Sequence, residues 1–269
     1  MARLRRLDAE LVRRGLARSR GQAAELVAAG RVDVGGAPAT KPATQVDPAA
    51  AIVVRPDPQD SPDYVSRGAH KLAGALDAFA PDGLAVAGRR CLDAGASTGG
   101  FTDVLLRRDA AEVIAVDVGY GQLAWSLRQD PRVRVLDRTN VRDLTPERVG
   151  DPVDLVVGDL SFISLRLVLR PLHAVTRSGG DLVLMVKPQF EVGRDRLGSG
   201  GVVRDPTARA DAVRGVAGAA LALGLGCRGV TASPLPGPSG NVEYFLWLTD
   251  GAPPLADDDL ARAVAEGPR

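Results

Sequence analysis

Short apolar segments alternate with segments of helical periodicity between residues 90 and 250, and this alternation restricts the fold more than any other feature. Continuous apolar runs of this length, separated by helices, indicate a parallel sheet buried on both faces. The last two runs flank the turn sequence LPGPSGN, which predicts an antiparallel pair at one edge. The sequence therefore predicts an α/β, doubly wound, mostly parallel sheet of the Rossmann-like type. Its seven strands are RCLDAG (90–95), VIAVD (113–117), VRVL (133–136), VDLVVGD (153–159), DLVLMVK (181–187), GVTASP (229–234) and EYFLWLT (243–249).

Composition excludes several classes of site. The two cysteines, Cys91 and Cys227, form no CxxC motif, and the two histidines, His70 and His173, are far apart. A zinc or other metal site and a redox pair are therefore not expected. The N-terminal segment breaks its apolar residues with charges, unlike a secretory signal, and no apolar run is long enough to span a bilayer. We expect a cytoplasmic protein without a membrane segment; the sequence leaves its oligomeric state open.

The first part of the chain is basic and has its own pattern. Residues 1–46 carry nine Arg or Lys and four acids, a net charge of +5 in a chain whose total is +1. Residues 7–29 predict two short helices, the first ended by Gly15 and the second capped by Ser19. RVDVGGAPA predicts a hairpin around its Gly-Gly turn, and AIVV a further strand. A small basic α+β domain of this kind is typical of polyanion binding, although a solvated helix face would look similar.

The predicted domain boundaries follow from composition. Residues 1–60 form the small domain, and the Pro- and Asp-rich stretch PDPQDSPD (56–63) indicates a linker, which we place over 61–66. Residues 67–250 form the sheet domain. Residues 251–269 are predicted to be a C-terminal tail.

A glycine-rich turn follows the first strand of the sheet. DAGASTGGF (93–101) permits a tight bend and close approach of a ligand to the backbone. Asp117 ends the next strand, where an acid can accept hydrogen bonds from ribose hydroxyls. The NAD fingerprint G-x-G-x-x-G fits poorly because position 97 is Ser, and a purely structural turn is the other alternative. The turn resembles the S-adenosylmethionine (SAM) loop of class I methyltransferases. The resemblance implies SAM as cofactor, with Asp93, Gly95, Ala96, Ser97, Thr98, Gly99, Gly100, Phe101, Asp117, Val118, Asn140 and Asp159 around it.

Two lysines and two acids form a candidate catalytic set. Lysine is scarce here, since only Lys41, Lys71 and Lys187 stand among 34 basic residues, and an amine can act as a base where a guanidinium cannot. Lys71 precedes the first strand, and Asp159 and Lys187 end two strands. Glu243 reaches the same edge only if the last strand is antiparallel. The alternative is that these are ordinary solvent-facing charges at strand ends.

These motifs resemble known families over nearly the whole chain. Residues 1–60 resemble the S4 RNA-binding domain, and Lys71, Asp159, Lys187 and Glu243 resemble the K-D-K-E tetrad of FtsJ-like RNA ribose 2′-O-methyltransferases. SRGAHKL matches the entry motif of the FtsJ-like family. The combination of an S4 domain with an FtsJ-like domain resembles the TlyA family of rRNA cytidine 2′-O-methyltransferases, also called hemolysin A-like, whose signatures match DAGASTGGFTDVLL, DVGYGQLAW, VKPQFEVGR, GGVVRD and GNVEYF. The one departure is Ala94, where relatives often carry Val. The resemblance implies ribosomal RNA of the 16S or 23S type, within ribosomal subunits, as the partner.

Arginines supply the predicted RNA contacts, because guanidinium groups suit phosphate. The Gly-rich segment FEVGRDRLGSGGVVRD is predicted to be a mobile loop that orders on RNA, with a static surface loop as the alternative. The predicted RNA-binding residues are Arg5, Arg6, Arg13, Arg18, Arg20, Arg31, Arg67, Arg194, Arg196 and Arg204.

The predicted reaction is methyl transfer to a ribose hydroxyl, with Lys187 as the base and Asp159 and Glu243 orienting the two lysines. The roles of Lys71 and Lys187 could be reversed. Two other functions stay open at this point: a non-catalytic RNA-binding protein on a retained cofactor fold, and a membrane-lytic hemolysin. The helices of residues 7–29 are Ala-rich and lack aromatic residues, which disfavours membrane lysis.

Overall fold

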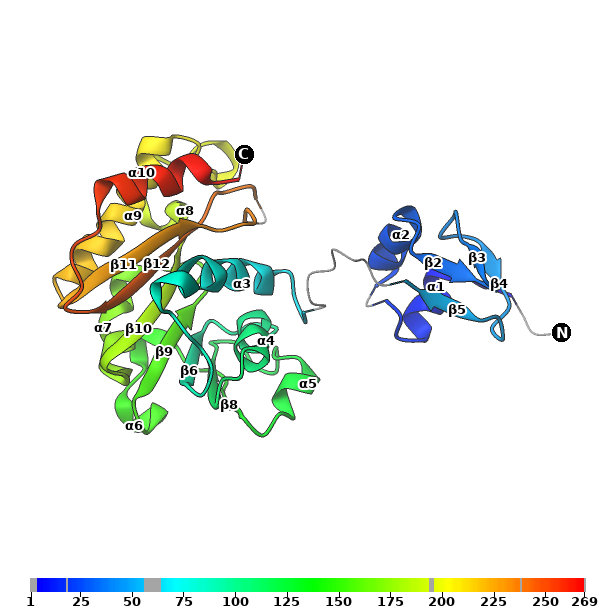
Figure 1. The fold of residues 1–269 in the computed structure, drawn as a ribbon, viewed down its shortest axis with the longest axis horizontal. Coiled ribbons are helices and arrows are strands. Elements are labelled where there is room, and N and C mark those ends of the chain that lie inside the picture. Colours follow the sequence, from blue (N-terminus) through cyan, green and yellow to red (C-terminus); the bar gives the residue numbers. More distant parts are fainter. Residues whose placement is uncertain (1–3, 18, 56–63, 194–195, 238, 269) are drawn as a thin grey trace. The chain divides into compact units, whose positions relative to one another are not determined.

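A computed structural model describes residues 4–17, 19–55, 64–193, 196–237 and 239–268. Its internal contacts divide the chain into two units, Met1–Asp63 and Tyr64–Arg269. Figure 1 shows the elements of each unit.

The smaller unit is a pair of helices packed on short strands. Ser19 caps α2 as predicted, since its hydroxyl accepts the Gln22 amide at 3.2 Å. Gly35 and Gly36, with φ of +59° and +83°, make the turn between β2 and β3. The strands β1 and β4, which pair antiparallel over two residues each, were not predicted. The elements are β1 (Arg5–Arg6), α1 (Leu7–Arg13), α2 (Arg20–Ala28), β2 (Val32–Val34), β3 (Ala37–Pro38), β4 (Gln45–Val46) and β5 (Ile52–Val54).

The larger unit contains a seven-stranded sheet in the order β11-β12-β10-β9-β6-β7-β8. In chain order, the first six elements of this unit are α3 (Gly68–Phe79), η1 (Ala80–Asp82), β6 (Arg90–Ala94), α4 (Gly100–Arg107), β7 (Glu112–Val116) and α5 (Trp125–Arg128). The middle of the unit holds β8 (Val133–Leu136), η2 (Val141–Asp143), α6 (Pro146–Val149), β9 (Val153–Gly158), η3 (Leu165–Leu167) and α7 (Leu169–Val175). The last part holds β10 (Thr176–Val186), α8 (Pro188–Glu191), η5 (Ser199–Gly201), α9 (Pro206–Leu221), β11 (Leu225–Ala232), β12 (Tyr244–Asp250) and α10 (Asp257–Glu266).

The strand directions confirm the predicted fold class. β8, β7, β6, β9 and β10 are successive neighbours in the sheet, and each pairs in parallel with the next. β12 is antiparallel to both β10 and β11. β12 therefore lies inside the sheet, with β11 at the edge, and its first residue is at the same end as the last residue of β10.

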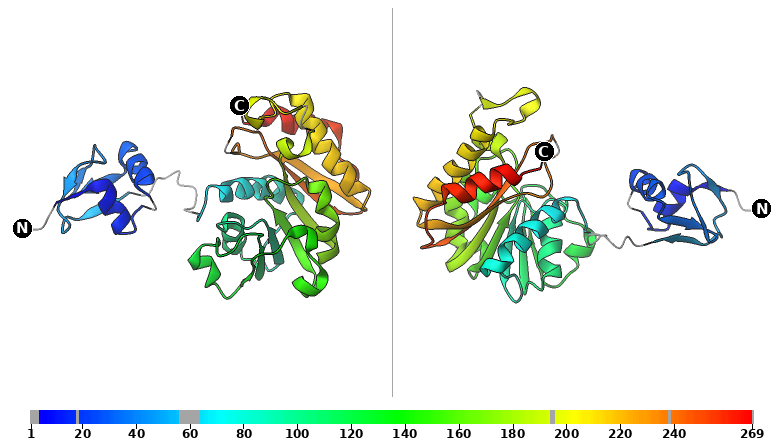
Figure 2. Two further views of the ribbon diagram at one scale, coloured as in Figure 1. Left: turned by 180° about the vertical axis from the view of Figure 1, so that it is seen from behind. Right: turned by 45° about the horizontal axis from the view of Figure 1, so that its top comes forward.

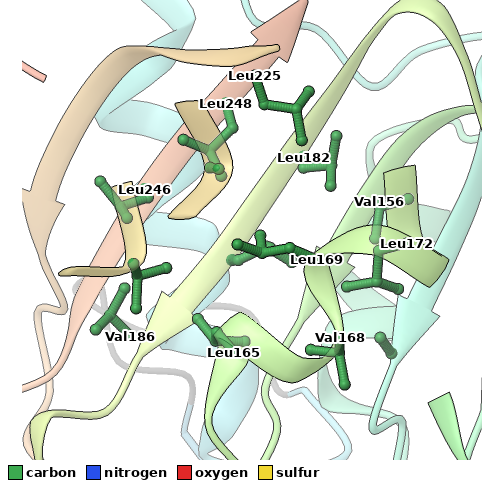
Figure 3. Close-up of a cluster of buried hydrophobic side chains, with 14 of the residues drawn as sticks. Val156, Leu165, Val168, Leu169, Leu172, Leu182, Val186, Leu225, Leu246 and Leu248 are labelled. Atoms are coloured by element: carbon green, nitrogen blue, oxygen red, sulfur yellow. The ribbon is translucent and has the colours of Figure 1, made fainter. Parts of the chain in front are cut away.

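Alternate side chains of the strands enter two separate cores. In β10, Leu182, Leu184 and Val186 face the core beneath α7, α9 and α10, while Val183 and Met185 face the core beneath α3 and α4. Figure 3 shows the first of these cores, where leucines of β10 and β12 meet those of α7. A strand buried on both faces must be apolar at every position, which is why the strands appear in the sequence as unbroken runs.

The unit boundaries differ from the predicted ones at both ends of the sheet domain. Tyr64 is buried, and the Val65 amide donates to Asp103, so the linker predicted over 61–66 runs into the larger unit. The predicted tail contains α10, whose Leu260 and Ala263 are buried in the core. Figure 2 shows α10 (red) on the same face of the sheet as α9. A helix with one apolar face is stabilised by such burial. The charged residues of the tail concealed this apolar face in the sequence.

Candidate active site

The glycine-rich bend connects β6 to α4 at the carboxyl end of the parallel strands. Gly95 has φ +85°, and a Cβ there would lie 2.9 Å from the carbonyl oxygen of Asp159. Gly99 has φ +99°, and a Cβ there would lie 2.3 Å from Leu127. Both positions therefore require glycine for conformation as well as for space. Ser97, also in the bend, has an unusual positive φ of +48°.

Asp117 holds the bend in place. One of its carboxylate oxygens accepts the Ser97 amide at 2.8 Å, and the other accepts the Gly119 amide at 2.7 Å. Each carboxylate oxygen can accept a second hydrogen bond. Asp117 therefore fixes the loop and keeps capacity for two ribose hydroxyls.

A cavity of about 730 Å³ opens beside the bend. This volume suits a nucleoside-containing ligand. Asn140 lines it and caps η2, accepting the Arg142 amide at 3.0 Å. Six residues predicted to bind the cofactor line the cavity: Gly95, Ser97, Asp117, Val118, Asn140 and Asp159. The close-packed glycine, the carboxylate with free acceptor capacity and the polar rim fit SAM.

The other predicted cofactor residues support the bend and are not part of the cavity lining. Asp93 is fully buried and accepts the Thr102 hydroxyl at 2.7 Å. Burial raises the pKa of Asp93 to about 7, with the Thr102 hydrogen bond opposing the rise. Phe101 lies in the core between α4 and the sheet. The residues outside the lining are Asp93, Ala96, Thr98, Gly99, Gly100 and Phe101.

Lys187 and Asp159 form an ion pair at the cavity wall. Lys187 follows β10, Asp159 follows β9, and Nζ lies 2.5 Å from Oδ1. Nζ also donates to the Ser161 hydroxyl at 2.7 Å. The Lys187 side chain is 9% exposed, while Asp159 and Ser161 both line the cavity. The base proposed from sequence is therefore held at the cofactor cavity by its two partners.

Lys71 and Glu243 form a second ion pair, with Nζ 2.6 Å from Oε2. Val186 of β10 is paired with Tyr244 of β12, so the antiparallel register brings Lys187 next to Glu243. The four residues of the predicted tetrad thus gather at one end of the sheet. Their catalytic roles stay a prediction.

The segment that follows Asp159 also belongs to the site, although it was not predicted to. Ser161 contacts Lys187, and Phe162 is 91% exposed at φ +63°, with its ring 5.4 Å from that of Phe190. Glu191 accepts hydrogen bonds from the Ser164 hydroxyl and the Leu165 amide, both at 2.7 Å. Burial raises the pKa of Glu191. The one signal in the sequence was the segment LSFIS (160–164), which mixes serines with apolar residues directly after Asp159 at the end of a strand.

The predicted RNA-binding arginines differ in their surroundings. Arg6 and Arg20 both pair with Asp8, and Arg13 pairs with Glu10. Arg5 is exposed and makes no ion pair with any described residue. In the larger unit, Arg67 and Arg204 are exposed, and Arg196 pairs with Asp211. Arg31 donates to the Arg55 carbonyl. Arg18 and Arg194 lie outside the described residues.

The Gly-rich segment before α9 is anchored where it is described. Val192 and Val203 are buried against Ala208 and Ala212. The Asn241 side chain accepts the Val203 amide and donates to the Gly201 carbonyl. The loop predicted to order on RNA thus has fixed points near both of its ends.

Comparisons with known proteins agree with this geometry. The FtsJ-like methyltransferase family matches residues 64–250, and the S4 domain family matches residues 5–52. The 16S/23S rRNA (cytidine-2′-O)-methyltransferase TlyA of Mycobacterium tuberculosis is 63% identical over the whole of both chains. The chain belongs to the TlyA family of FtsJ-like methyltransferases.

Two more distant relatives extend the comparison. The 23S rRNA (cytidine-2′-O)-methyltransferase TlyA of Campylobacter jejuni is 35% identical over 68% of this chain and 70% of its own. A hemolysin-named protein of known structure from Streptococcus thermophilus is 36% identical, with a TM-score of 0.74, over 99% of this chain and 96% of its own. Family membership confirms the resemblance that the motifs indicated.

The described residues contain neither a membrane-spanning helix nor a cluster of metal ligands. No helix in that part of the chain has the length and apolarity needed to cross a bilayer. Nor do His, Cys, Asp and Glu side chains gather there in a group that could hold a metal ion.

Proposed function

We propose that this protein transfers a methyl group from SAM to the 2′-hydroxyl of a cytidine ribose in 16S rRNA, 23S rRNA or both. One observation carries the proposal: a Lys–Asp ion pair forms part of the same site as a glycine bend and a ribose-binding acid. Asp159, which pairs with the Lys187 amine, and Asp117 thus line one cavity although they follow different strands of the sheet. A cofactor site with a general base at its wall is what alkylation of a hydroxyl requires.

The substrate follows from the family and from the smaller unit. The relative from M. tuberculosis acts on 16S and 23S rRNA and that from C. jejuni on 23S rRNA, as their names state. The S4 domain adds a basic surface that suits phosphates. We infer that the partners are ribosomal subunits, which places the protein in the cytoplasm.

The chain's own residues handle the proton. SAM supplies, when bound, a methyl group already activated by a positive sulfur. The ribose hydroxyl is a weak nucleophile, so its proton must be accepted as it reacts. Lys187 accepts that proton at Nζ, and Asp159 stabilises the resulting ammonium from 2.5 Å away.

The environment of each lysine favours Lys187 as the base. Both partners of Lys187, Asp159 and Ser161, line the cofactor cavity. The partner of Lys71 is Glu243, whose side chain is 1% exposed and lies outside that lining. Lys71 therefore acts as a fixed positive charge behind the reacting group.

The cavity residues divide the cofactor between them. Asp117 binds the ribose hydroxyls through the free acceptor capacity of its two oxygens, and Asn140 and Val118 border the adenine. Gly95 lines the cavity and must lack a side chain, because a Cβ there would collide with the Asp159 backbone.

The test uses 30S and 50S subunits, tritiated SAM and mapping of ribose methylation. Wild-type protein should label a cytidine 2′-oxygen. Lys187→Arg should bind SAM with unchanged affinity and lose methylation by about 10²- to 10⁴-fold. Lys41→Arg, a matched change at an exposed lysine of the smaller unit, should retain activity. If the wild-type protein placed no methyl group on any ribose, the proposal would be refuted. If Lys187→Arg kept full activity, the role of Lys187 as the base would be refuted.

A further inference from the structure

We propose that Ser161 is a positioning residue that aims the Lys187 amine at the ribose hydroxyl. This inference rests on the proposed function and deepens it. Ser161 comes two residues after Asp159, and its hydroxyl accepts a hydrogen bond from Lys187 Nζ at 2.7 Å.

The geometry of an amine gives this contact its importance. A neutral lysine amine is tetrahedral, with two N–H donors and one lone pair besides its carbon. Asp159 and Ser161 take two positions around Nζ, at 2.5 and 2.7 Å, and they are its hydrogen-bonding and ionic partners among the described residues. The Ser161 hydroxyl fixes one N–H group while the contact with Asp159 holds Nζ in place, so rotation about the Cε–Nζ bond is restricted and the lone pair keeps one direction. The proton of the 2′-hydroxyl moves to that lone pair and becomes the third N–H bond of the ammonium.

Without Ser161, one N–H group has no fixed partner, and the amine can rotate about its Cε–Nζ bond while keeping the ion pair with Asp159. The lone pair would then sample other directions. Alignment of reacting groups contributes strongly to rate, and small misplacements can be costly. Ser161 thus affects the turnover number through Lys187, without touching the reacting atoms itself.

A second set of contacts fixes the segment that carries Ser161. Glu191, four residues after Lys187, accepts the Ser164 hydroxyl and the Leu165 amide, both at 2.7 Å. The Glu191 side chain is 1% exposed and also lies 3.4 Å from Arg166. The segment after β9 and the segment after β10 are therefore joined at two places, Ser161 to Lys187 and Ser164 to Glu191.

Backbone strain between these two places supports a functional reason for the arrangement. Phe162 adopts φ +63°, which is uncommon for a bulky residue and costs on the order of 1 kcal/mol or more. Such a conformation persists only when its surroundings hold it, and strained residues cluster at functional sites. Here the strained residue directly follows the serine that contacts the base.

The experiment compares Ser161→Thr with Ser161→Val. The two variants have nearly the same shape, and Ser161 is exposed, so both should fold alike. Thr keeps the accepting hydroxyl and Val removes it. We expect Ser161→Val to lower kcat by about 10- to 100-fold, with unchanged KM for RNA and unchanged SAM affinity, and Ser161→Thr to stay near the wild-type value.

A second measurement is independent of turnover. The chain has three lysines, so ¹⁵N labelling of lysine gives three side-chain signals. The Lys187 NH₃⁺ signal should be protected from exchange with water in the wild type and in Ser161→Thr, and broadened in Ser161→Val. Equal kcat and equal Lys187 signals in the two variants would overturn the assignment of Ser161. A wild-type protein that shows the protected signal but no methylation would instead refute the proposed function.

Discussion

Lys71 and Glu243, 172 residues apart in sequence, form a buried ion pair in which Nζ donates to Oε2 at 2.6 Å. The pair joins α3, ahead of the sheet, to the residue before the last strand. The other oxygen of Glu243, Oε1, is buried without a hydrogen-bond partner among the described residues. Buried charges are costly when unpaired, so this contact links the stability of the domain to its active site.

Removing one partner of this pair should destabilise the protein more than removing both. We expect Lys71→Met to lower the free energy of unfolding by about 3 kcal/mol, because it leaves Glu243 charged and unpaired. The double variant with Glu243→Met should recover most of that loss. Urea unfolding of the two single variants and the double variant measures the coupling.

Methylation should be lost in all three of these variants, including the stable double variant. A coupling energy near zero would contradict the structural role of the pair. A double variant that is both stable and active would remove Lys71 and Glu243 from the reaction.

Asp93 should make stability depend on pH in an unusual direction. Its pKa in the folded protein is about 7, raised mainly by burial from an ordinary value of 3.8. The folded state therefore holds the proton more tightly than the unfolded chain. This contribution to stability is complete below about pH 4 and is lost as the pH rises through about 7.

Asp93→Asn removes that titration while keeping the shape of the side chain. The wild type loses this contribution as the pH rises and the variant does not. The free energy of unfolding of the variant minus that of the wild type should therefore increase by about 2 kcal/mol when the pH is raised from 5 to 8. Denaturant unfolding at both pH values measures the difference. The control is Asp258→Asn, an exposed position on α10, for which the difference should not change with pH. A constant difference for Asp93→Asn would show that Asp93 is already ionised at pH 5.

Arg5 and Arg13 should contribute unequally to RNA binding although the sequence ranks them alike. Arg13 donates two hydrogen bonds to Glu10, at 2.6 and 2.8 Å, and with Arg14 lowers the pKa of Glu10 to about 2. Its charge is thus already compensated, whereas that of Arg5 is available to a phosphate. Arg5→Gln should weaken binding to an rRNA fragment and reduce the slope of log K against log salt by about 1.

Arg13→Gln should change this slope less. Filter binding at several KCl concentrations tests both variants. Equal slopes for the two would show that the Glu10 ion pair opens when RNA binds.

Phe162 should affect RNA rather than cofactor. An aromatic ring that is 91% exposed, on the residue that follows the Lys187 partner Ser161, is placed to stack on an unpaired nucleobase. Phe162→Ala should weaken productive RNA binding by roughly 5- to 100-fold, in line with about 1–3 kcal/mol per stacked base, and Phe162→Tyr should not. KM for RNA and SAM affinity, measured separately, distinguish the two effects; a loss confined to SAM affinity would disprove stacking.

The sequence predicted the parts of this structure that depend on periodicity and on local backbone chemistry. The five inner strands β7, β6, β9, β10 and β12 are visible because they are buried on both faces. Gly15 and Gly30 end the helices of the smaller unit with φ near +70°. The strand ends also located Asp159 and Lys187, because a charged residue stops an apolar run. The antiparallel course of the last strand, inferred from one turn, correctly brought Glu243 to the same edge.

Other parts depend on contacts that no local pattern encodes. Ser161 and Glu191 gain their roles from how two loops meet, and neither residue type is unusual in a loop. The pairing of β1 with β4 involves two residues on each strand, too few to show alternation. Asp93 matched a cofactor motif, yet the fold buries it beneath the bend, where it supports the loop through Thr102.

The interior position of β12 has a consequence for how the enzyme is made. Tyr244–Asp250, the last strand to be synthesised, fills the space between β10 and β11 and brings Glu243 to Lys71. A nascent chain that stops before this point leaves two strands with open edges, which are prone to aggregate. An rRNA-modifying enzyme of this design therefore gains its activity only after β12 has left the ribosome that translates it.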